Sequence, residues 1–366
     1  MSAAYRHERY SDAGTSRVPK YGLRWRPLGD EITLRGTHSN AFVAPSLFAL
    51  FGPTTQSAAG SRVVRTGANP ALKPSTAKTY SFGAVYSPKA VAGLTFGVDY
   101  VDVRQVSLVG TAGVTEILNS VNNSGTSSPY IAQVAFGNWP TNPDPTLPPA
   151  TPITGPHQLD ALLAGGATAS TVYVTDSRIN ISGKTVKSLD VSASYAFPRS
   201  GLGKFGLSTT GTFFLHYRFK ALPTQIYYEY AGHVTDSQGT LPGMKWFTAL
   251  TWGKGNWSAA LNNSYIDRVV DLGSGGVTYA TSTTLRRVPV PSYSSWDTSV
   301  SYSFRDLGNS RAARLLSGLR LTLGVNNVGD KMPPAAPQAF GSDVGVDLAT
   351  YNPVGRLWYL SASLKF

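Results

Sequence analysis

The segment Lys204–Phe219 alternates apolar and polar side chains with a period of two. Phe205, Leu207 and Phe213 mark one face, while the opposite face carries Ser, Thr, His and Arg side chains. A period of two predicts a β-strand. Such a strand extends about 53 Å at roughly 3.3 Å per residue, whereas strands of globular proteins run to about five or six residues. This length, with a single apolar face, predicts the wall of a β-barrel that extends beyond a bilayer.

The same alternation recurs along the whole chain and predicts about twelve strands in one unit, residues 1–366. The predicted strands are 2–10, 17–27, 31–40, 75–87, 92–104, 178–197, 203–219, 242–252, 256–268, 292–304, 318–328 and 354–366. Short and long connectors alternate between them, which is typical of an outer-membrane barrel with tight periplasmic turns and long outer loops. The fold class predicted is therefore all-β, an antiparallel transmembrane β-barrel. Within the longest loop, residues 114–122 favour a short helix and residues 138–145 favour irregular structure. In the short connector 305–317, residues 311–316 favour a helical turn.

Composition agrees with this class and limits the partners. The chain holds 32 Lys and Arg against 20 Asp and Glu, a formal net charge of +12. Such a balance predicts an anionic partner, and the basic residues are too dispersed to favour nucleic acid. Outer-membrane lipid and lipopolysaccharide are the expected partners. No stretch of eighteen apolar residues is present, and Met1–Glu8 shows no charged head followed by an apolar core.

Enzyme and metal chemistry find little support in the sequence. There is no cysteine, and the five histidines have no metal-ligand spacing. Nucleophile-elbow, zinc-protease and phosphate-loop motifs are absent from the sequence. We therefore expect neither catalytic residues nor a metal or cofactor site.

Four segments and the last residue resemble a known family. Phe42–Phe51 is similar to the F-R-A-P-S-L-x-E-L segment of TonB-dependent outer-membrane receptors, and Asn69–Pro74 to the N-P-x-L-K-P-E segment that follows it. Asn326–Asp330 resembles the N-N-L-F-D segment, and Asn352–Arg356 resembles the P-G-R before the final strand. The chain ends in Phe366, as outer-membrane barrels commonly do. The resemblance covers nearly the whole chain, in the family's order.

The chain departs from the family pattern at three of these positions. Val43 stands where the family usually has Arg, and Ala49 and Ser75 stand where it often has Glu. These replacements leave the plug and gating contacts of those positions open.

The resemblance implies a receptor that takes up a scarce ligand, such as an iron–siderophore complex, with energy from the TonB complex. It also implies a leader, a coupler-binding motif, a plug domain and 22 strands. The chain is expected to correspond to the last twelve strands, in the outer membrane, with the plug and N-terminal strands as partners; alone it is not expected to perform energised uptake. A self-closed twelve-strand passive pore, an adhesin-like barrel and a soluble β-rich binding protein are alternatives.

Two groups of residues are predicted to carry function. Aromatic and basic side chains in the outer loops are candidates for ligand binding, although Tyr-rich loops also occur simply as packed loops. These candidates are Tyr227, Tyr228, Tyr230, Trp139, Phe51, Phe340, Arg286 and Arg287. Charged residues at the polar positions of strands are predicted to face the lumen and the plug, as in any aqueous barrel interior. These are Arg24, Arg26, Arg35, Asp99, Asp190, Arg218, Asp297 and Arg320.

Overall fold

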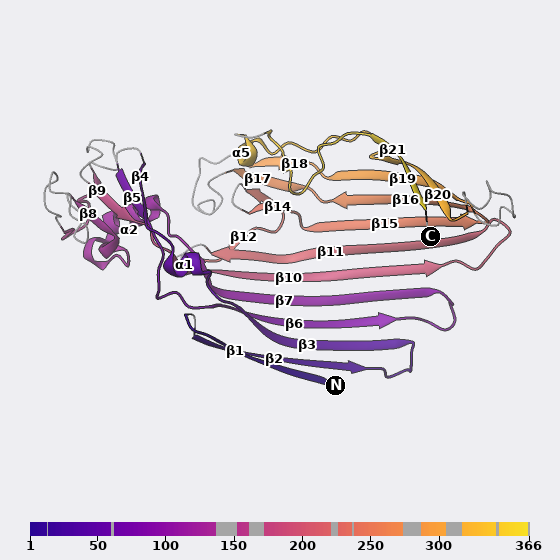
Figure 1. Ribbon diagram of the computed structural model, residues 1–366, viewed down its shortest axis with the longest axis horizontal. Coiled ribbons are helices and arrows are strands. Elements are labelled where there is room, and N and C mark those ends of the chain that lie inside the picture. Colours follow the sequence, from indigo (N-terminus) through magenta and orange to yellow (C-terminus); the bar gives the residue numbers. More distant parts are fainter. Residues whose placement is uncertain are drawn as a thin grey trace.

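The computed structural model describes residues 1–12, 14–59, 62–136, 152–160, 172–220, 226–235, 238–273, 287–304, 317–341 and 344–364. Twelve long strands form one antiparallel sheet in chain order (Figure 1). These are β1 (Ser2–Tyr10), β2 (Gly14–Trp25), β3 (Ile32–Val43), β6 (Ser75–Tyr86), β7 (Leu94–Gly110), β10 (Ile179–Ala196), β11 (Lys204–Lys220), β15 (Met244–Lys254), β16 (Trp257–Ile266), β19 (Tyr293–Ser303), β20 (Leu319–Asn326) and β21 (Leu357–Leu364). Each overlaps a predicted strand, so the predicted strand set is confirmed.

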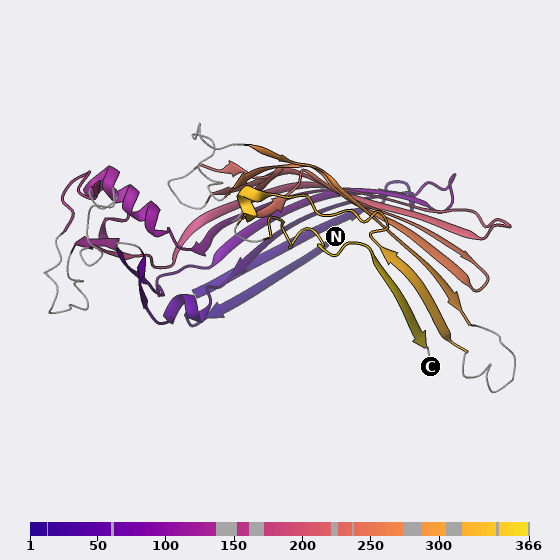
Figure 2. The same cartoon turned by 90° about the horizontal axis from the view of Figure 1, so that it is seen from above.

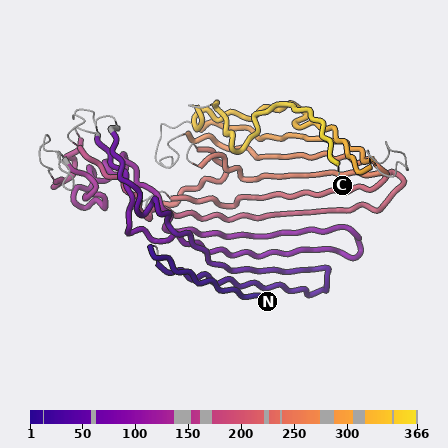
Figure 3. The backbone as a smooth tube through the Cα atoms, in the orientation of Figure 1, coloured from indigo at the N-terminus to yellow at the C-terminus, as the bar shows by residue number. Residues whose placement is uncertain are grey.

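The sheet is a curved wall with two ends, β1 and β21 (Figures 2 and 3). Among the described residues these two strands do not pair with each other. Neighbouring strands are joined alternately at the short-turn end and at the end that carries the long loops (Figure 1). The long loops all leave the same end of the wall, as the alternation of connector lengths predicted.

One face of the wall, the apolar face, carries rows of apolar side chains in direct register. One such row crosses β7, β10, β11, β15 and β16, and each of its residues pairs directly with the next: Leu94, Tyr195, Leu207, Leu250 and Leu261. Directly paired residues of antiparallel strands point to the same face. Leu207, Leu250 and Leu261 are all exposed, although they are large and apolar. In the described part of the chain, no second layer covers this face.

The first group of long loops forms a small folded body, the first loop unit. It contains α1 (Leu47–Phe51), α2 (Val114–Ser124), the 3-10 turns η1 (Gly125–Ser127) and η2 (Ile131–Gln133), and four short strands. The strands β4 (Thr55–Ala59), β5 (Arg62–Thr66), β9 (Val172–Thr175) and β8 (Val134–Phe136) pair in that order. Because β5 and β9 come from different loops and pair in parallel, this sheet joins the two loops. Ile117, Leu118 and Val121 of α2 lie at the centre of its core, with no exposed surface.

A second loop unit lies at the same end of the wall, beside the C-terminal strands (Figure 1). Its sheet has the order β14 (Gly239–Leu241), β13 (His233–Thr235), β17 (Val269–Gly273) and β18 (Val288–Val290). The short helix α5 (Pro337–Phe340) packs on this sheet, and Val234, Val269 and Val290 are buried with Ala336 and Ala339. The dry cores therefore lie in the loop units.

The loops differ in part from the sequence expectation. The predicted helix at 114–122 is confirmed as α2, which continues two residues further, to Ser124. The segment 41–74, predicted as a connector, contains α1 and a hairpin. Residues 138–145 and 311–316 lie outside the described residues. None of the described helices combines the length and apolar character needed to cross a membrane.

Candidate functional site

A charged row crosses the polar face, which is the side opposite the apolar face. The row crosses β2, β3, β6, β7 and β10, with one directly paired residue on each strand: Arg24, Arg35, Gly83, Asp99 and Asp190. Arg35 Nε donates to Asp99 Oδ1 at 2.7 Å, and the guanidinium also bonds the second carboxylate oxygen. Asp190 Oδ1 accepts from the Thr212 hydroxyl at 2.6 Å. The register therefore brings four of the predicted lumen residues onto one face.

Two further predicted lumen residues share this face on later strands. Asp297 pairs with Asn262, and Arg320 pairs with Ser303, which is six residues from Asp297 on β19. Asp297 Oδ1 accepts from the Asn327 N–H at 2.7 Å, and Arg320 donates to Ser258 Oγ at 3.0 Å. Arg26 lies in the turn after β2 and pairs with Asp30 at 2.6 Å. Most of these side chains thus hold fixed polar partners.

Arg218 does not share the polar face, so its predicted grouping with Asp190 is wrong. The pairing of β10 with β11 skips Leu215, a β-bulge between the pairs Lys187–His216 and Ser188–Phe214. Arg218 pairs with Thr185, which is five residues from Asp190 on the same strand. Because faces alternate along a strand, Arg218 points to the apolar face.

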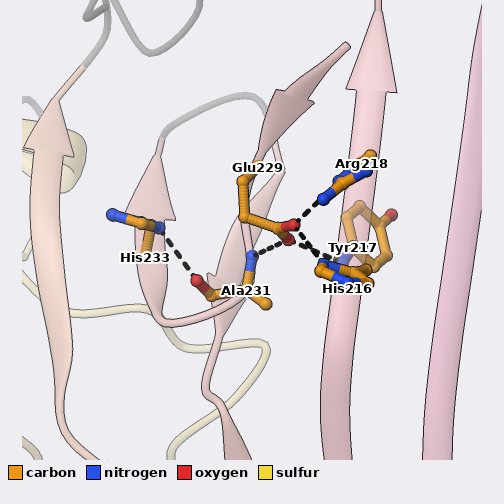
Figure 4. Close-up of polar contacts among 6 residues, drawn as sticks. All are labelled: His216, Tyr217, Arg218, Glu229, Ala231 and His233. Atoms are coloured by element: carbon orange, nitrogen blue, oxygen red, sulfur yellow. Dashed lines mark hydrogen bonds and ion pairs between the residues drawn. The ribbon is translucent and has the colours of Figure 1, made fainter.

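Glu229 organises a polar cluster where β12 (Tyr228–Glu229) pairs with the loop end of β11 (Figure 4). Its Oε2 lies 2.8 Å from His216 Nδ1 and accepts from Arg218 Nε at 3.1 Å. Its Oε1 accepts from the N–H groups of Tyr217 at 2.8 Å and Ala231 at 3.2 Å. Desolvation opposes ionisation of this carboxyl, but the hydrogen bonds outweigh it and hold the pKa of Glu229 below its ordinary value. The carboxylate therefore fixes the segment after residue 225 against the wall.

The three tyrosines predicted to bind ligand have different surroundings. Tyr227 is exposed, and Lys220 Nζ lies 5.3 Å from its ring centroid. Tyr228 is half-buried and pairs with Phe219. Tyr230 is only 1% exposed and packs edge-on against Phe219, with ring centroids 6.3 Å apart. Tyr230 therefore presents no ring surface to a ligand, and of the three only Tyr227 is exposed.

The remaining loop candidates are divided between the two loop units. Phe51 is exposed at the end of α1, a helix that Ser46 caps through a hydrogen bond from the Ala49 N–H at 3.1 Å. Phe340 is half-buried against the second loop core, and Arg287 is exposed beside β18. Trp139 and Arg286 lie outside the described residues. The described candidates Phe51, Phe340 and Arg287 are therefore not gathered into one cluster.

Segments that carry the family resemblance make hydrogen bonds near the ends of wall strands. Asp330 Oδ1 accepts from the Arg356 N–H at 2.7 Å, and Arg356 Nε donates to the Val328 carbonyl at 2.9 Å. These bonds join the ends of β20 and β21. Asn69 Nδ2 likewise donates to the Arg178 carbonyl at 2.9 Å, at the start of β10. These bonds thus hold long loops at the ends of β10, β20 and β21.

Charged residues Asp102 and Arg104 were missed by the sequence reasoning. They occupy the positions on β7 that continue the apolar series ending at Tyr100. The change from apolar to charged side chains at these positions could have been recognised in the sequence. In the described ranges no three His, Cys, Asp or Glu side chains are grouped to hold a metal ion.

Comparison with known proteins agrees with this geometry. No curated protein sequence matches the chain. The family described as TonB dependent receptor-like, beta-barrel matches residues 1–328. The chain belongs to the TonB-dependent receptor β-barrel family. Its wall is thus part of an antiparallel transmembrane β-barrel, with the apolar face turned to lipid.

Solved TonB-dependent receptors share the fold. A double mutant of the ferric enterobactin receptor PfeA from Pseudomonas aeruginosa is 18% identical, with a TM-score of 0.61 over 99% of this chain. The siderophore receptor PirA from Acinetobacter baumannii is 15% identical, with a TM-score of 0.62 over 99% of this chain. The FrpB iron transporter from Neisseria meningitidis is 14% identical, with a TM-score of 0.56. The chain spans 42%, 43% and 39% of these three proteins.

Proposed function

We propose that the chain is the C-terminal wall of an outer-membrane receptor that takes up a scarce ligand, such as an iron–siderophore complex, with energy from the TonB complex. The separation of the wall into an exposed apolar face and a charged polar face carries this proposal. Lipid on one side and an aqueous or plugged lumen on the other are the surroundings that such faces match. The fold shared with siderophore receptors supports the ligand class.

The polar face is the proposed plug side. The row from Arg24 to Asp190 places both signs of charge at one level of the wall, and the Arg35–Asp99 pair leaves part of each side chain exposed. Such groups can form charge-assisted hydrogen bonds to a plug domain. Strands preceding β1 and following β21 in the closed wall are the proposed partners of the two sheet ends, because an unpaired strand edge is not tolerated in hydrocarbon.

Ligand capture is proposed at the loop end, with Tyr227, Phe51 and Arg287 as the exposed described candidates. Tyr228 and Phe340 contribute partly exposed rings. Aromatic rings offer large contact area at a small loss of conformational freedom, and Arg can pair with anionic groups of a ligand. Trp139 and Arg286 remain candidates from the sequence.

Uptake of a radiolabelled iron–siderophore complex by cells tests the proposal. Fractionation should place the protein in the outer membrane, and deletion of its gene or of the coupler gene should abolish uptake. A protein that stays soluble without detergent would refute the membrane location. Coupler-independent flux, with a uniform conductance in planar bilayers, would instead support the passive pore.

A further inference from the structure

The apolar face changes character towards the loop end of β6, β7, β10 and β11. Phe82, Tyr100, Leu189 and Phe213 form the last apolar row in direct register. The next paired positions on the same face are Tyr80, Asp102, Lys187 and His216. They lie two residues further along β6, β7 and β10, and three further along β11, where the bulge adds Leu215. The next row is Lys78, Arg104, Thr185, Arg218 and Glu229. The lipid-facing side therefore carries two charged rows above its apolar rows.

The height of these rows corresponds to a membrane interface. An apolar band about 25 Å tall, crossed by strands tilted roughly 40°, takes up about ten residues of each strand. On β7 the apolar positions begin at Leu94, and Arg104 lies ten residues further on. Stacked rings flank the rows on the β1 side, where His38 lies between Tyr21 and Tyr80, with centroids 6.5 and 4.5 Å away. Amphipathic rings favour the same interfacial level.

The charged rows carry an excess of cations, which we call the basic patch. Its cationic members in these rows are Lys78, Arg104, Lys187 and Arg218. Lys220 joins them, because it lies two residues beyond Arg218 on the same face of β11 and pairs with Gly183. Only two carboxylates, Asp102 and Glu229, share this surface in the described residues. Because cations outnumber carboxylates, the basic patch has a net positive charge with His216 neutral.

The two carboxylates position the cations without covering them. Asp102 is 6% exposed and bonds Arg104 at 2.9 Å, with Lys187 at 3.7 Å. Glu229 holds Arg218 in the same way. The side chains of Arg104 and Arg218 nevertheless stay 57% and 48% exposed. Each guanidinium therefore keeps donors that point into the interface, at two places on one surface.

We infer that the basic patch binds the phosphate groups of an outer-leaflet glycolipid headgroup. Phosphate is favoured because paired guanidinium groups match its oxygens in geometry and charge. The acyl chains of the same lipid would lie along the apolar rows below. Tyr227, one of the loop candidates for ligand capture, borders the basic patch, because Lys220 Nζ lies 5.3 Å from its ring centroid. The inference rests on the proposed outer-membrane location of the chain.

Binding of purified lipid A to the detergent-extracted protein, counted by native mass spectrometry, tests this inference. Each basic residue near a membrane surface contributes about 1 kcal/mol, which is about fivefold in affinity. The double variant Arg104→Gln/Arg218→Gln should therefore bind about 25-fold more weakly. Wild-type protein should likewise lose affinity for lipid A from which the phosphates have been removed. Equal binding of dephosphorylated lipid A, or wild-type affinity in the double variant, would overturn the inference.

Two further variants keep the test decisive. Lys254→Gln removes a charge from the apolar side of β15 at the short-turn end, because Lys254 is two residues beyond Trp252 and four beyond Leu250. It should bind lipid A as the wild type does, and an equal loss there would overturn the site.

Lys78→Gln/Lys220→Gln removes two cations of the basic patch and keeps every ion pair of Asp102 and Glu229. It should also bind about 25-fold more weakly, and unchanged binding would again overturn the site. This readout needs no uptake, so failure of the transport proposal is seen separately.

Discussion

The Arg35 guanidinium on β3 bonds the Asp99 carboxylate on β7 across the intervening strand β6. The register places Gly83 of β6 directly between them. A Cβ on residue 83 would overlap the Asp99 carboxylate, so the absence of a side chain there is what allows the two charged groups to meet. This relationship spans three strands and cannot be read from any one of them.

Gly83→Ala should uncouple this ion pair. A part-exposed pair is worth about 0.5–1 kcal/mol, measured as the coupling energy in a double-mutant cycle of Arg35→Gln and Asp99→Asn. In the Gly83→Ala background we expect that coupling to fall towards zero. The control is Gly36→Ala, because a Cβ there meets Phe82 Cδ1 at an ordinary 3.4 Å. An undiminished coupling in Gly83→Ala would contradict the proposed role of the glycine.

Leu250→Arg should destabilise the protein in a bilayer, because Leu250 lies on the lipid-facing apolar face. Arg on the lipid side costs about 2–4 kcal/mol at the midplane and less near the interfaces, so we expect a loss of about 2 kcal/mol. Ala249→Arg is the matched control, since residue 249 points to the polar face. Unfolding in urea from lipid vesicles measures both. Equal losses would show that the faces are not separated in this way.

Leu118→Ala should open the first loop unit without unfolding the wall. Leu118 has no exposed surface, and removal of a buried Leu side chain costs about 2–5 kcal/mol. Proteases should then cut between residues 111 and 178 while the long strands stay protected. Asn119→Ala is the control, because Asn119 is exposed on the same helix. Resistance of the loop in Leu118→Ala would mean that its core is not needed for its structure.

Acid should loosen β13 of the second loop unit. Burial lowers the pKa of His233 below its ordinary value of 6.5, outweighing the hydrogen bond between Nδ1 and the Ala231 carbonyl at 3.0 Å. A pKa lowered by folding contributes stability that is complete above pH 6.5 and is lost as the pH falls towards the folded value.

Hydrogen exchange of the Val234 and Thr235 amides between pH 7.5 and 5.5 measures this effect, after correction for intrinsic exchange rates. Protection should decrease with falling pH in the wild type. His233→Asn, which keeps a side-chain donor and does not titrate, should remove most of that dependence. The same pH dependence in both proteins would assign the effect to other groups.

Much of the wall could be predicted from the sequence. Alternation of the kind seen in Lys204–Phe219 is local, since a side chain's face depends only on its position along an extended chain. The positions of the strands, the order of short and long connectors, the helix at α2 and the family itself followed from such local patterns, whereas several strand ends differ, such as that of β7 at Gly110 and not at residue 104. The predicted polar residues within the strands, from Arg24 to Arg320, share one face for the same reason, with Arg218 as the exception; Arg26 lies in a turn.

The exceptions all depend on contacts between distant segments. The extra residue at Leu215 turns Arg218 to the apolar face. The alternation is interrupted there by the apolar run Phe213–Leu215, but the run does not by itself show which residue the pairing skips. Tyr230 is buried because β11 supplies Phe219 against its ring. The loop units form only when β5 meets β9, and β13 meets β17.

The sequence alone therefore determined that this protein is a two-faced β-wall of the TonB-dependent receptor family, because periodicity and motifs are properties of short stretches of chain. Tertiary structure alone decided which charged groups meet, as Arg35 and Asp99 do over Gly83, and which loop residues are exposed. The reason is physical: the face of a side chain is set by its own backbone, whereas its partners are set by the register of neighbouring strands.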